Sequence, residues 1–436
     1  MTRRTWALAC AALLLAGAAT APCAAGQAPQ AALGAPGDPA RAAVIESRAI
    51  APRALTREEA VALSLSQGSR AALAAAAARA AAARLVTAGA VANPTLNASY
   101  SKSVPRYHAT VDLPLDVLLL RPLRVAAATS ASEAAGDRLA LERALVRLTV
   151  DTLYTTAAAA AVHARLAARN AAAAESLLVA ARIRRDAGDA SDLDVELARV
   201  SAGQAANAAA SDSLAAIAGL LDVQAALGMP AGEVSIALAD SLALPAPDSL
   251  ARLSRGGAAA GTPLAVSAAE HDVRAAEQTI RVERRGGWSG LAVQAGVEAY
   301  DPTGSETGVL PTVGLSLPLP IFRAHRGDVA LAMAERDRAA LELAVARRES
   351  AGAAARAERE LNAAAARAER DRDLAASASR LAALAVRAYG EGAYGLAAVL
   401  EAERNARESL AQLADDTAAV LRASAVVRFY SEATAP

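Results

Sequence analysis

The sequence predicts a mainly α-helical fold with a small β part. Two stretches of about 60 residues, Arg124–Asp186 and Asp328–Tyr389, contain no proline and only one glycine each, so each can form one long helix. Four short segments instead alternate strictly between apolar and polar residues, which is typical of strands with one apolar face. Alanine supplies 129 of the 436 residues, whereas aromatic residues supply 3%. This composition favours helices whose backbones pack closely over a compact core of large side chains.

The N-terminus has the order of a secretory signal peptide. Within residues 1–26, Arg3-Arg4 precede the apolar run Trp6–Ala19, and small residues follow it up to Gly26. Cleavage there would remove both cysteines, Cys10 and Cys23, and leave a mature chain without thiols. Lipidation of Cys23 is the alternative, although the residues before it make a poor lipoprotein box.

The rest of the chain is a tandem duplication that follows a leader rich in Ala, Pro and Gly. Leu113-Pro114-Leu115 recurs 204 residues later as Leu317-Pro318-Leu319, and Gly188 recurs with the same offset as Gly392. Each copy has the order helix, two strands, very long helix, glycine-centred break and second helix. We therefore divide the chain into a signal peptide (1–26), a flexible leader (27–53), a first repeat (54–230), a linker (231–261), a second repeat (262–431) and a C-terminal tail (432–436).

The long helices are expected to pack on two sides. In the first of them, Leu141, Leu145 and Leu148 form one apolar stripe, and a second stripe runs through Val146 and Val150. Two stripes on one helix predict neighbours on two sides, as in a sheet or cylinder of helices.

The four strand segments, at 95–101, 107–113, 291–299 and 312–317, are expected to form hairpins with one apolar and one polar face. Past the signal peptide we expect no membrane-spanning helix, so a membrane would have to be crossed by strands. Four strands cannot close a barrel, and open sheet edges are not tolerated in lipid, so several copies would be needed, with 8 strands in two copies or 12 in three. The polar residues expected to line the water-filled lumen are Asn97, Thr110, Asp112, Gln294 and Glu298.

At four places the chain resembles the TolC-type outer-membrane efflux protein family, the outer membrane factors of tripartite efflux pumps. The resemblance covers nearly all of residues 55–431 and rests on the order and spacing of Leu55-Thr56-Arg57-Glu58-Glu59-Ala60, Ala88-Gly89-Ala90-Val91-Ala92-Asn93-Pro94-Thr95-Leu96, Ala187-Gly188-Asp189-Ala190-Ser191-Asp192-Leu193-Asp194-Val195 and Ala226-Leu227-Gly228-Met229-Pro230. It implies a long antiparallel α-helical coiled-coil barrel in the periplasm that continues into a transmembrane β-barrel of the outer membrane, with four strands per protomer, closed as a trimer of 12 strands.

The resemblance also implies a function. It predicts a passive exit duct for efflux, which is no enzyme, uses no cofactor and receives substrate from an inner-membrane pump through a periplasmic adaptor. The alternatives are a duct for type I protein secretion and a periplasmic coiled-coil scaffold with soluble hairpins. The sequence does not reveal the transported substrate.

The glycine-centred breaks are the expected contact sites for the adaptor. Gly188 and Gly392 predict left-handed turns that reverse the chain. Gly395 stands where the first copy has Ser191, so the two turns are not expected to be equivalent. The resemblance implies adaptor contacts at Gly188, Ser191, Leu193, Gly392 and Leu396. The nearby carboxylates Asp189, Asp192, Asp194 and Glu391 either ring the entrance of a trimer or cap the helices.

Other chemistry finds little support in the sequence. The histidines His108, His163, His271 and His325 are scattered and the cysteines are confined to the N-terminus, so we expect no metal site. Lys+Arg and Asp+Glu both number 45, which argues against a nucleic-acid partner. Adjacent carboxylates such as Asp415-Asp416 point to different sides of a helix, so they cannot act together as acid and base.

Overall fold

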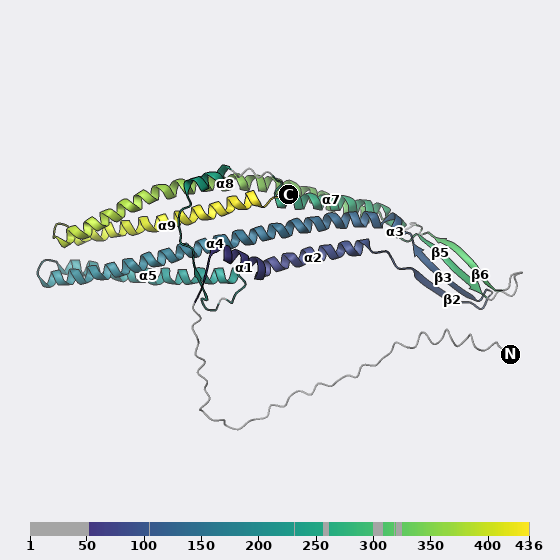
Figure 1. Ribbon diagram of the computed structural model, residues 1–436, viewed down its shortest axis with the longest axis horizontal. Coiled ribbons are helices and arrows are strands. Elements are labelled where there is room, and N and C mark those ends of the chain that lie inside the picture. Colours follow the sequence, from purple (N-terminus) through teal and green to yellow (C-terminus); the bar gives the residue numbers. More distant parts are fainter. Residues whose placement is uncertain are drawn as a thin grey trace, which may run out of the picture. The chain divides into compact units, whose positions relative to one another are not determined.

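The computed structural model describes residues 52–103, 105–230, 232–255, 261–299, 308–317, 319 and 325–435, so the predicted signal peptide and all but the end of the leader lie outside the described residues. The fold is mainly α-helical with a small β part, as predicted (Figure 1). The elements in chain order are β1 (Arg53–Leu55), α1 (Arg57–Gln67), α2 (Ser69–Gly89), β2 (Thr95–Tyr100), β3 (Tyr107–Pro114), α3 (Asp116–Leu119), α4 (Arg121–Asp186), α5 (Asp192–Ala226), β4 (Ile236–Leu238), α6 (Pro247–Arg255), α7 (Leu264–Arg285), η2 (Gly286–Trp288), β5 (Ala292–Ala299), β6 (Val309–Ser316), α8 (Arg326–Gly390) and α9 (Leu396–Glu432).

The two very long helices organise the fold. The helix α4 has 66 residues and α8 has 65, so each spans roughly 100 Å at 1.5 Å per residue. The helices α5 and α2 follow each other along α4, and α9 and α7 follow each other along α8 in the same way (Figure 1). The helix α4 also contacts α7 and α9, so it joins the two repeats.

The sequence predicts one helix before the first strand, but the structure breaks it into α1 and α2. Gly68 ends α1 and begins α2 in an extended conformation, and a Cβ atom at this position would lie 2.2 Å from the carbonyl oxygen of Ser64. Glycine is therefore required for this bend. The start of α1 follows the sequence, because Thr56 and Glu59 form a reciprocal capping box.

Small residues let the helices approach closely. Ala181 and Ala368 are fully buried, and a Cβ atom added to Gly219 of α5 would lie 3.1 Å from the Cα atom of Ala157 on α4. Larger side chains on these faces would push the helices apart. The alanine-rich composition is thus used for packing, as the sequence indicated.

The middle of the helical part is fixed by a short parallel pair, β1 with β4. The buried hydroxyl of Tyr154 on α4 donates to the carbonyl oxygen of Leu55 at 2.8 Å and accepts from the backbone N–H of Asp240 at 3.1 Å. Both β4 and α6 lie in the stretch expected to be a linker, so this stretch contributes secondary structure, and β1 begins at the end of the expected leader. Strands this short give no periodic signal in a sequence.

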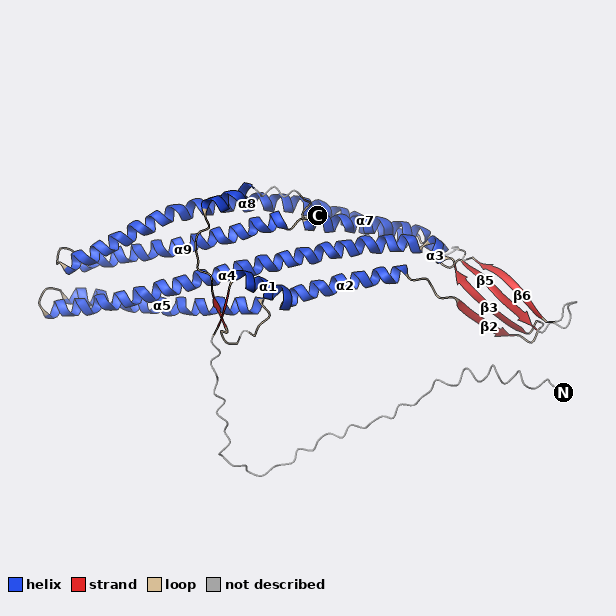
Figure 2. Cartoon of the chain, viewed as in Figure 1, coloured by secondary structure: helices blue, strands red, loops and turns tan. Residues whose placement is uncertain are grey.

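The remaining strands form one antiparallel sheet in the order β2-β3-β5-β6, at one end of the helices (Figure 2). All four predicted strand segments are confirmed. The second hairpin joins the first through the pair β3–β5, so the two repeats meet in the middle of the sheet. The strands β2 and β6 are the edges of the sheet.

Candidate functional site

The first turn, between α4 and α5, is made by Gly188. Its φ is 87°, in the left-handed region where only glycine is free of strain. The backbone N–H of Asp189 donates to the carbonyl oxygen of Arg184 at 2.8 Å, and the N–H of Gly188 donates to that of Arg185 at 2.9 Å. These two bonds form a Schellman motif, and the predicted left-handed turn at Gly188 is confirmed.

The second turn, between α8 and α9, has the same design at Gly392, whose φ is 75°. The N–H of Gly392 donates to the carbonyl oxygen of Tyr389 at 3.0 Å, and the N–H of Ala393 donates to that of Ala388 at 2.9 Å. The helix that follows begins differently, because Gly395 offers no capping side chain. Ser191 in the first turn forms a capping box with Asp194. The two turns are therefore not equivalent, as predicted.

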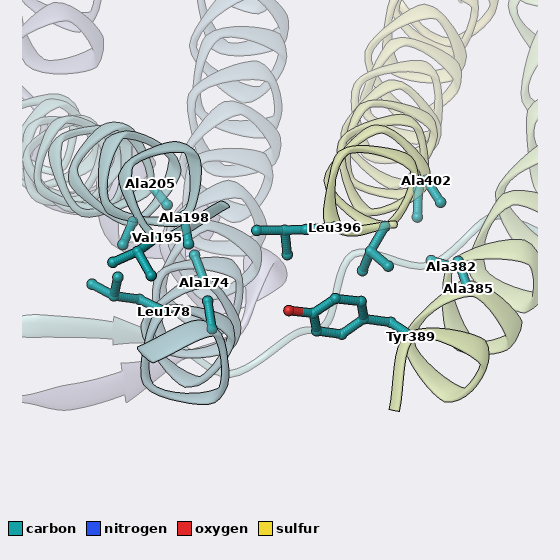
Figure 3. Packing of buried hydrophobic residues seen from close by; sticks show 14 residues of the cluster. Ala174, Leu178, Val195, Ala198, Ala205, Ala382, Ala385, Tyr389, Leu396 and Ala402 are labelled. Atoms are coloured by element: carbon teal, nitrogen blue, oxygen red, sulfur yellow. The ribbon is translucent and has the colours of Figure 1, made fainter. Parts of the chain in front are cut away.

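A contact between Arg184 and Tyr389 holds the two turns together. The Arg184 guanidinium donates to the carbonyl oxygen of Tyr389 at 2.8 Å and lies 4.6 Å from the centre of the Tyr389 ring. Figure 3 shows the Tyr389 ring and the Leu396 side chain pointing from the α8–α9 pair toward the α4–α5 pair. Both belong to one buried cluster that includes Val195 and Val399. The ends of the two helical hairpins are thus packed into a single unit.

The residues expected to contact an adaptor do not all lie on the surface. Gly188, Ser191, Leu193 and Gly392 are exposed, with 68% of Leu193 accessible. Leu396 is only 2% exposed and belongs to the buried cluster, so the expectation of a surface contact at Leu396 is not met. The burial of Leu396 could not be predicted from the sequence, because it depends on the packing of the α4–α5 pair against the start of α9.

The four expected entrance carboxylates lie in and beside these turns. Asp194 accepts from the Ser191 backbone N–H at 3.0 Å, so it caps a helix. Asp189 and Glu391 are exposed, and the Asp192 side chain is 91% exposed and lies 3.9 Å from Arg185. The Arg185 guanidinium donates hydrogen bonds to the Asp186 carboxylate, and this raises the pKa of the guanidinium. This end therefore carries acidic groups in water, partly offset by arginine.

A groove of about 530 Å³ runs between the α4–α5 pair and α9, near the turns. Its apolar lining includes Leu177, Leu197, Val200 and Leu400. Its polar lining includes Asn170, Gln204, Glu401 and Arg404. A groove lined by both apolar and polar side chains suits an amphipathic helix.

The opposite end of the protein carries the polar face of the sheet. Asn97 lies opposite Thr110, Asp112 opposite Gln294, and Glu298 opposite His108, so all five expected lumen residues share one face. The Asn97 amide donates to the Asp112 carboxylate at 2.9 Å, and His108 Nδ1 lies 3.4 Å from a Glu298 oxygen. His108 was not among the expected site residues, although its place in the alternation gives the signal.

The other face of the sheet is apolar and exposed. It carries Leu96 and Leu315, which are 70% and 64% exposed, and Val313, which is 84% exposed. Such a surface needs an apolar phase or a protein partner to cover it. A sheet with one polar and one strongly apolar exposed face is the arrangement that a barrel wall in lipid requires.

One helix, α2, has the length and mean hydropathy of a membrane span, contrary to the expectation of none after the signal peptide. Only 6% of its apolar window is buried. Much of the hydropathy comes from alanine, and Arg79 and Arg84 lie within the helix. Length and composition alone are therefore weak grounds for a span here.

The histidines and paired carboxylates mostly make structural contacts. His163 Nε2 lies 2.9 Å from Asp415, which joins α4 to α9, and Asp416 accepts from Arg367 at 3.1 Å. His325 differs, because it lies with Glu283 and Asp328 in a group of three potential metal ligands. The sequence does not reveal this group, because Glu283 lies at the end of α7 and the other two residues lie at the start of α8, on the far side of the β5–β6 hairpin.

Tyr154 and Tyr389 give a matched test of these contacts. Tyr154→Phe should lower the free energy of unfolding by about 0.5–1.5 kcal/mol, because the backbone N–H of Asp240 loses its acceptor, whereas the carbonyl oxygen of Leu55 still accepts from the N–H of Ala239. Tyr389→Phe should leave it unchanged or raise it by up to about 1 kcal/mol, because the buried Tyr389 hydroxyl has no hydrogen-bond partner among the described residues. Denaturant titration of the detergent-solubilised protein measures both, and equal losses would show that the Tyr389 hydroxyl is satisfied.

No protein-family model and no curated protein matches the chain. Solved structures do. The chain is similar to the CmeC outer membrane channel of Campylobacter jejuni, with a TM-score of 0.70 and 14% identity over 87% of this chain and 86% of that one. It is also similar to the outer membrane protein VceC of Vibrio cholerae, with a TM-score of 0.68 and 15% identity over 86% of this chain and 96% of that one. The MtrE outer membrane channel of Neisseria gonorrhoeae, in its open state, matches with a TM-score of 0.65 and 16% identity over 86% of this chain and 88% of that one. The chain therefore has the fold of these outer-membrane channels.

Proposed function

We propose that this protein is an outer-membrane channel of the TolC type, a passive exit duct of a tripartite efflux system. The observation that carries the proposal is the four-stranded sheet, which has one polar face, one exposed apolar face and two edges without a partner strand among the described residues. A sheet of this kind is stable in lipid only when its edges are paired. The similarity to outer-membrane channels supports the same conclusion.

The directions of the edge strands suit closure by several copies. All neighbours in the sheet are antiparallel, so β2 and β6 run in opposite directions. The β6 strand of one copy can therefore pair antiparallel with the β2 strand of the next, which continues the pattern without interruption. Three copies would give a 12-strand barrel, with Asn97, Thr110, Asp112, Gln294 and Glu298 facing its lumen.

The helices also carry apolar surface for neighbouring copies. Leu374, Leu381 and Leu384 of α8 follow heptad spacing and are 55–61% exposed, and Leu214 of α5 is 68% exposed. A ring of copies would bury these faces against one another. We therefore propose a homotrimer whose helices continue the barrel as a tunnel in the periplasm, after export directed by residues 1–26.

The helical turns are the proposed entrance and the proposed contact with a periplasmic adaptor of an inner-membrane pump. Gly188, Ser191, Leu193 and Gly392 supply exposed surface there, and the groove lined by Leu197 and Leu400 can accept a partner helix. Three copies would also repeat Asp189, Asp192 and Glu391 around the entrance, which would favour cations. The channel performs no chemistry, so it needs neither a cofactor nor an energy source of its own.

Cysteine cross-linking of the sheet edges tests the proposal. If cleavage removes Cys10 and Cys23, the mature chain contains no thiol, so an introduced pair reacts without background. We expect Leu96→Cys on β2, combined with single cysteines scanned from Val309 to Leu315 on β6, to join chains into closed trimers in isolated outer membranes. The control is each single-cysteine variant, which should run as a monomer on denaturing gels once the sample has been heated, whereas cross-linked trimers should survive heating. A water-soluble periplasmic monomer without cross-links would contradict the proposal and support a scaffold.

A further inference from the structure

Three potential metal ligands meet where the second repeat enters the sheet. Glu283 lies in the last turn of α7, His325 precedes α8, and Asp328 lies in the first turn of α8. One ligand atom of each residue lies within 4.8 Å of the others. None of these three residues takes part in the turns or in the polar face of the sheet. The group lies at the opposite end of α8 from the turn at Gly392.

The imidazole nitrogen of this group is left without a hydrogen bond. His325 Nδ1 lies 3.2 Å from a carboxylate oxygen of Asp328, yet this buried nitrogen has no hydrogen-bond partner among the described residues. A buried imidazole nitrogen in this state, with carboxylates beside it, can bind a metal ion.

The backbone holds the imidazole in this position. Among the described residues, His325 is the one non-glycine residue with a positive φ, at 52°. Its side chain does not cap α8, and its ring lies against Gly286, where an added Cβ would be 3.1 Å from Nδ1. A non-glycine residue in a left-handed conformation is uncommon and strained, so the surrounding structure must hold it there.

The first repeat builds the same junction with a fixed positive charge. Arg121 stands 204 residues before His325, and its Nε donates to the carbonyl oxygen of Gly89 at the end of α2, at 2.7 Å. Arg124, which corresponds to Asp328, pairs with Asp116 at 2.7 Å. The second repeat has an imidazole and a carboxylate at these two positions and a further carboxylate on the opposing helix. The guanidinium groups of one copy are thus replaced by groups that attract a cation.

We propose that Glu283, His325 and Asp328 bind one divalent transition-metal ion of the Zn²⁺ type. An imidazole with two carboxylates suits Zn²⁺ far better than Mg²⁺ or Ca²⁺, which prefer oxygen ligands alone. Tetrahedral Zn²⁺ places neighbouring ligand atoms roughly 3.3–3.5 Å apart, close to the distance between His325 and Asp328. The side chains of His325 and Asp328 are 28% and 33% exposed, which leaves room for water as the fourth ligand.

Such an ion would link the end of α7 to the start of α8. Along the chain, α7 is followed by the short helix η2 and then β5, and α8 is the next helix after β6. The metal site would therefore fix the junction of the second repeat, as Arg121 fixes that of the first. The proposal does not depend on the efflux function, because it concerns the residues of a single chain.

Zinc titration of the detergent-solubilised, tag-free protein tests the site after treatment with EDTA. We expect one Zn²⁺ per chain by calorimetry, without competition from millimolar Mg²⁺, and an absorption band of tetrahedral Co²⁺ when cobalt is used. The variants His325→Asn, Glu283→Gln and Asp328→Asn should each weaken binding at least tenfold. Asparagine accepts the left-handed conformation, so His325→Asn keeps the turn.

His163→Asn is the matched control, because His163 has one carboxylate neighbour, on α9, and belongs to no group of three potential ligands among the described residues. Its zinc affinity should equal that of the unmodified protein. Zinc binding that is absent, or that responds equally to His325→Asn and His163→Asn, would overturn the proposal. Circular dichroism confirms that each variant is folded, so that a loss of binding reports on the ligands.

Discussion

Gly296→Ala should prevent the four-stranded sheet from assembling. Gly296 lies in β5, opposite Thr110 of β3 and Thr312 of β6. A Cβ atom here would lie 2.6 Å from the backbone carbonyl oxygen of Ala109 and 2.7 Å from the Thr110 side chain. The carbonyl oxygen belongs to the central β3–β5 pair, so it cannot move without breaking the seam between the repeats. We expect a loss of about 3 kcal/mol per chain, at the upper end of the overpacking range, and three such losses in one barrel.

Gly314→Ala is the matched control in the same sheet. The atom nearest to a Cβ there is the amide oxygen of Gln294 at 3.1 Å, at the end of a flexible side chain that can rotate away. Heat-modifiable trimers on denaturing gels should therefore persist in Gly314→Ala and disappear in Gly296→Ala. Trimers of equal thermal stability in the two variants would show that the β3–β5 pair is looser than the structure indicates.

The sheet shows what alternation in a sequence can predict. A period of two fixes which residues share a face, so Asn97, Thr110 and Gln294 could be placed together before the register was known. It does not fix which strands are neighbours. The pairing of β3 with β5, and with it the close approach at Gly296, depends on how the two repeats meet.

The helices were predictable for a different reason. Long stretches without proline fixed α4 and α8 to within about three residues at either end, because few other features can stop a helix. The break at Gly68 was not predicted, since an isolated glycine within an alanine-rich stretch is compatible with a continuous helix. The meeting of Glu283 with His325 was also beyond the sequence, because it depends on two helices that follow different sides of a hairpin.

Leu396→Ala should destabilise the turn end of the molecule by about 2–5 kcal/mol, whereas Leu193→Ala should change stability by less than about 0.5 kcal/mol. Leu193 lies at the start of α5 and Leu396 at the start of α9, the helices that follow the two turns. Leu396 is 2% exposed and packs in the cluster with Val195, Val399 and Tyr389, whereas Leu193 is 68% exposed. Removing the Leu396 side chain leaves a cavity between the two hairpins, and removing that of Leu193 leaves none.

The two variants therefore test two different roles, packing between the hairpins for Leu396 and contact with a partner protein for Leu193. Hydrogen exchange of the backbone amides in residues 382–399 should speed up in Leu396→Ala and stay unchanged in Leu193→Ala. Affinity for the proposed adaptor, measured with the purified channel, should fall in Leu193→Ala while the trimer remains intact, because an exposed apolar side chain is free to contact a partner. If Leu193→Ala leaves the adaptor affinity unchanged, Leu193 is not part of the proposed contact surface. If Leu396→Ala leaves the rate of hydrogen exchange unchanged, the ends of the two helical hairpins are held together mainly by Arg184 and Tyr389.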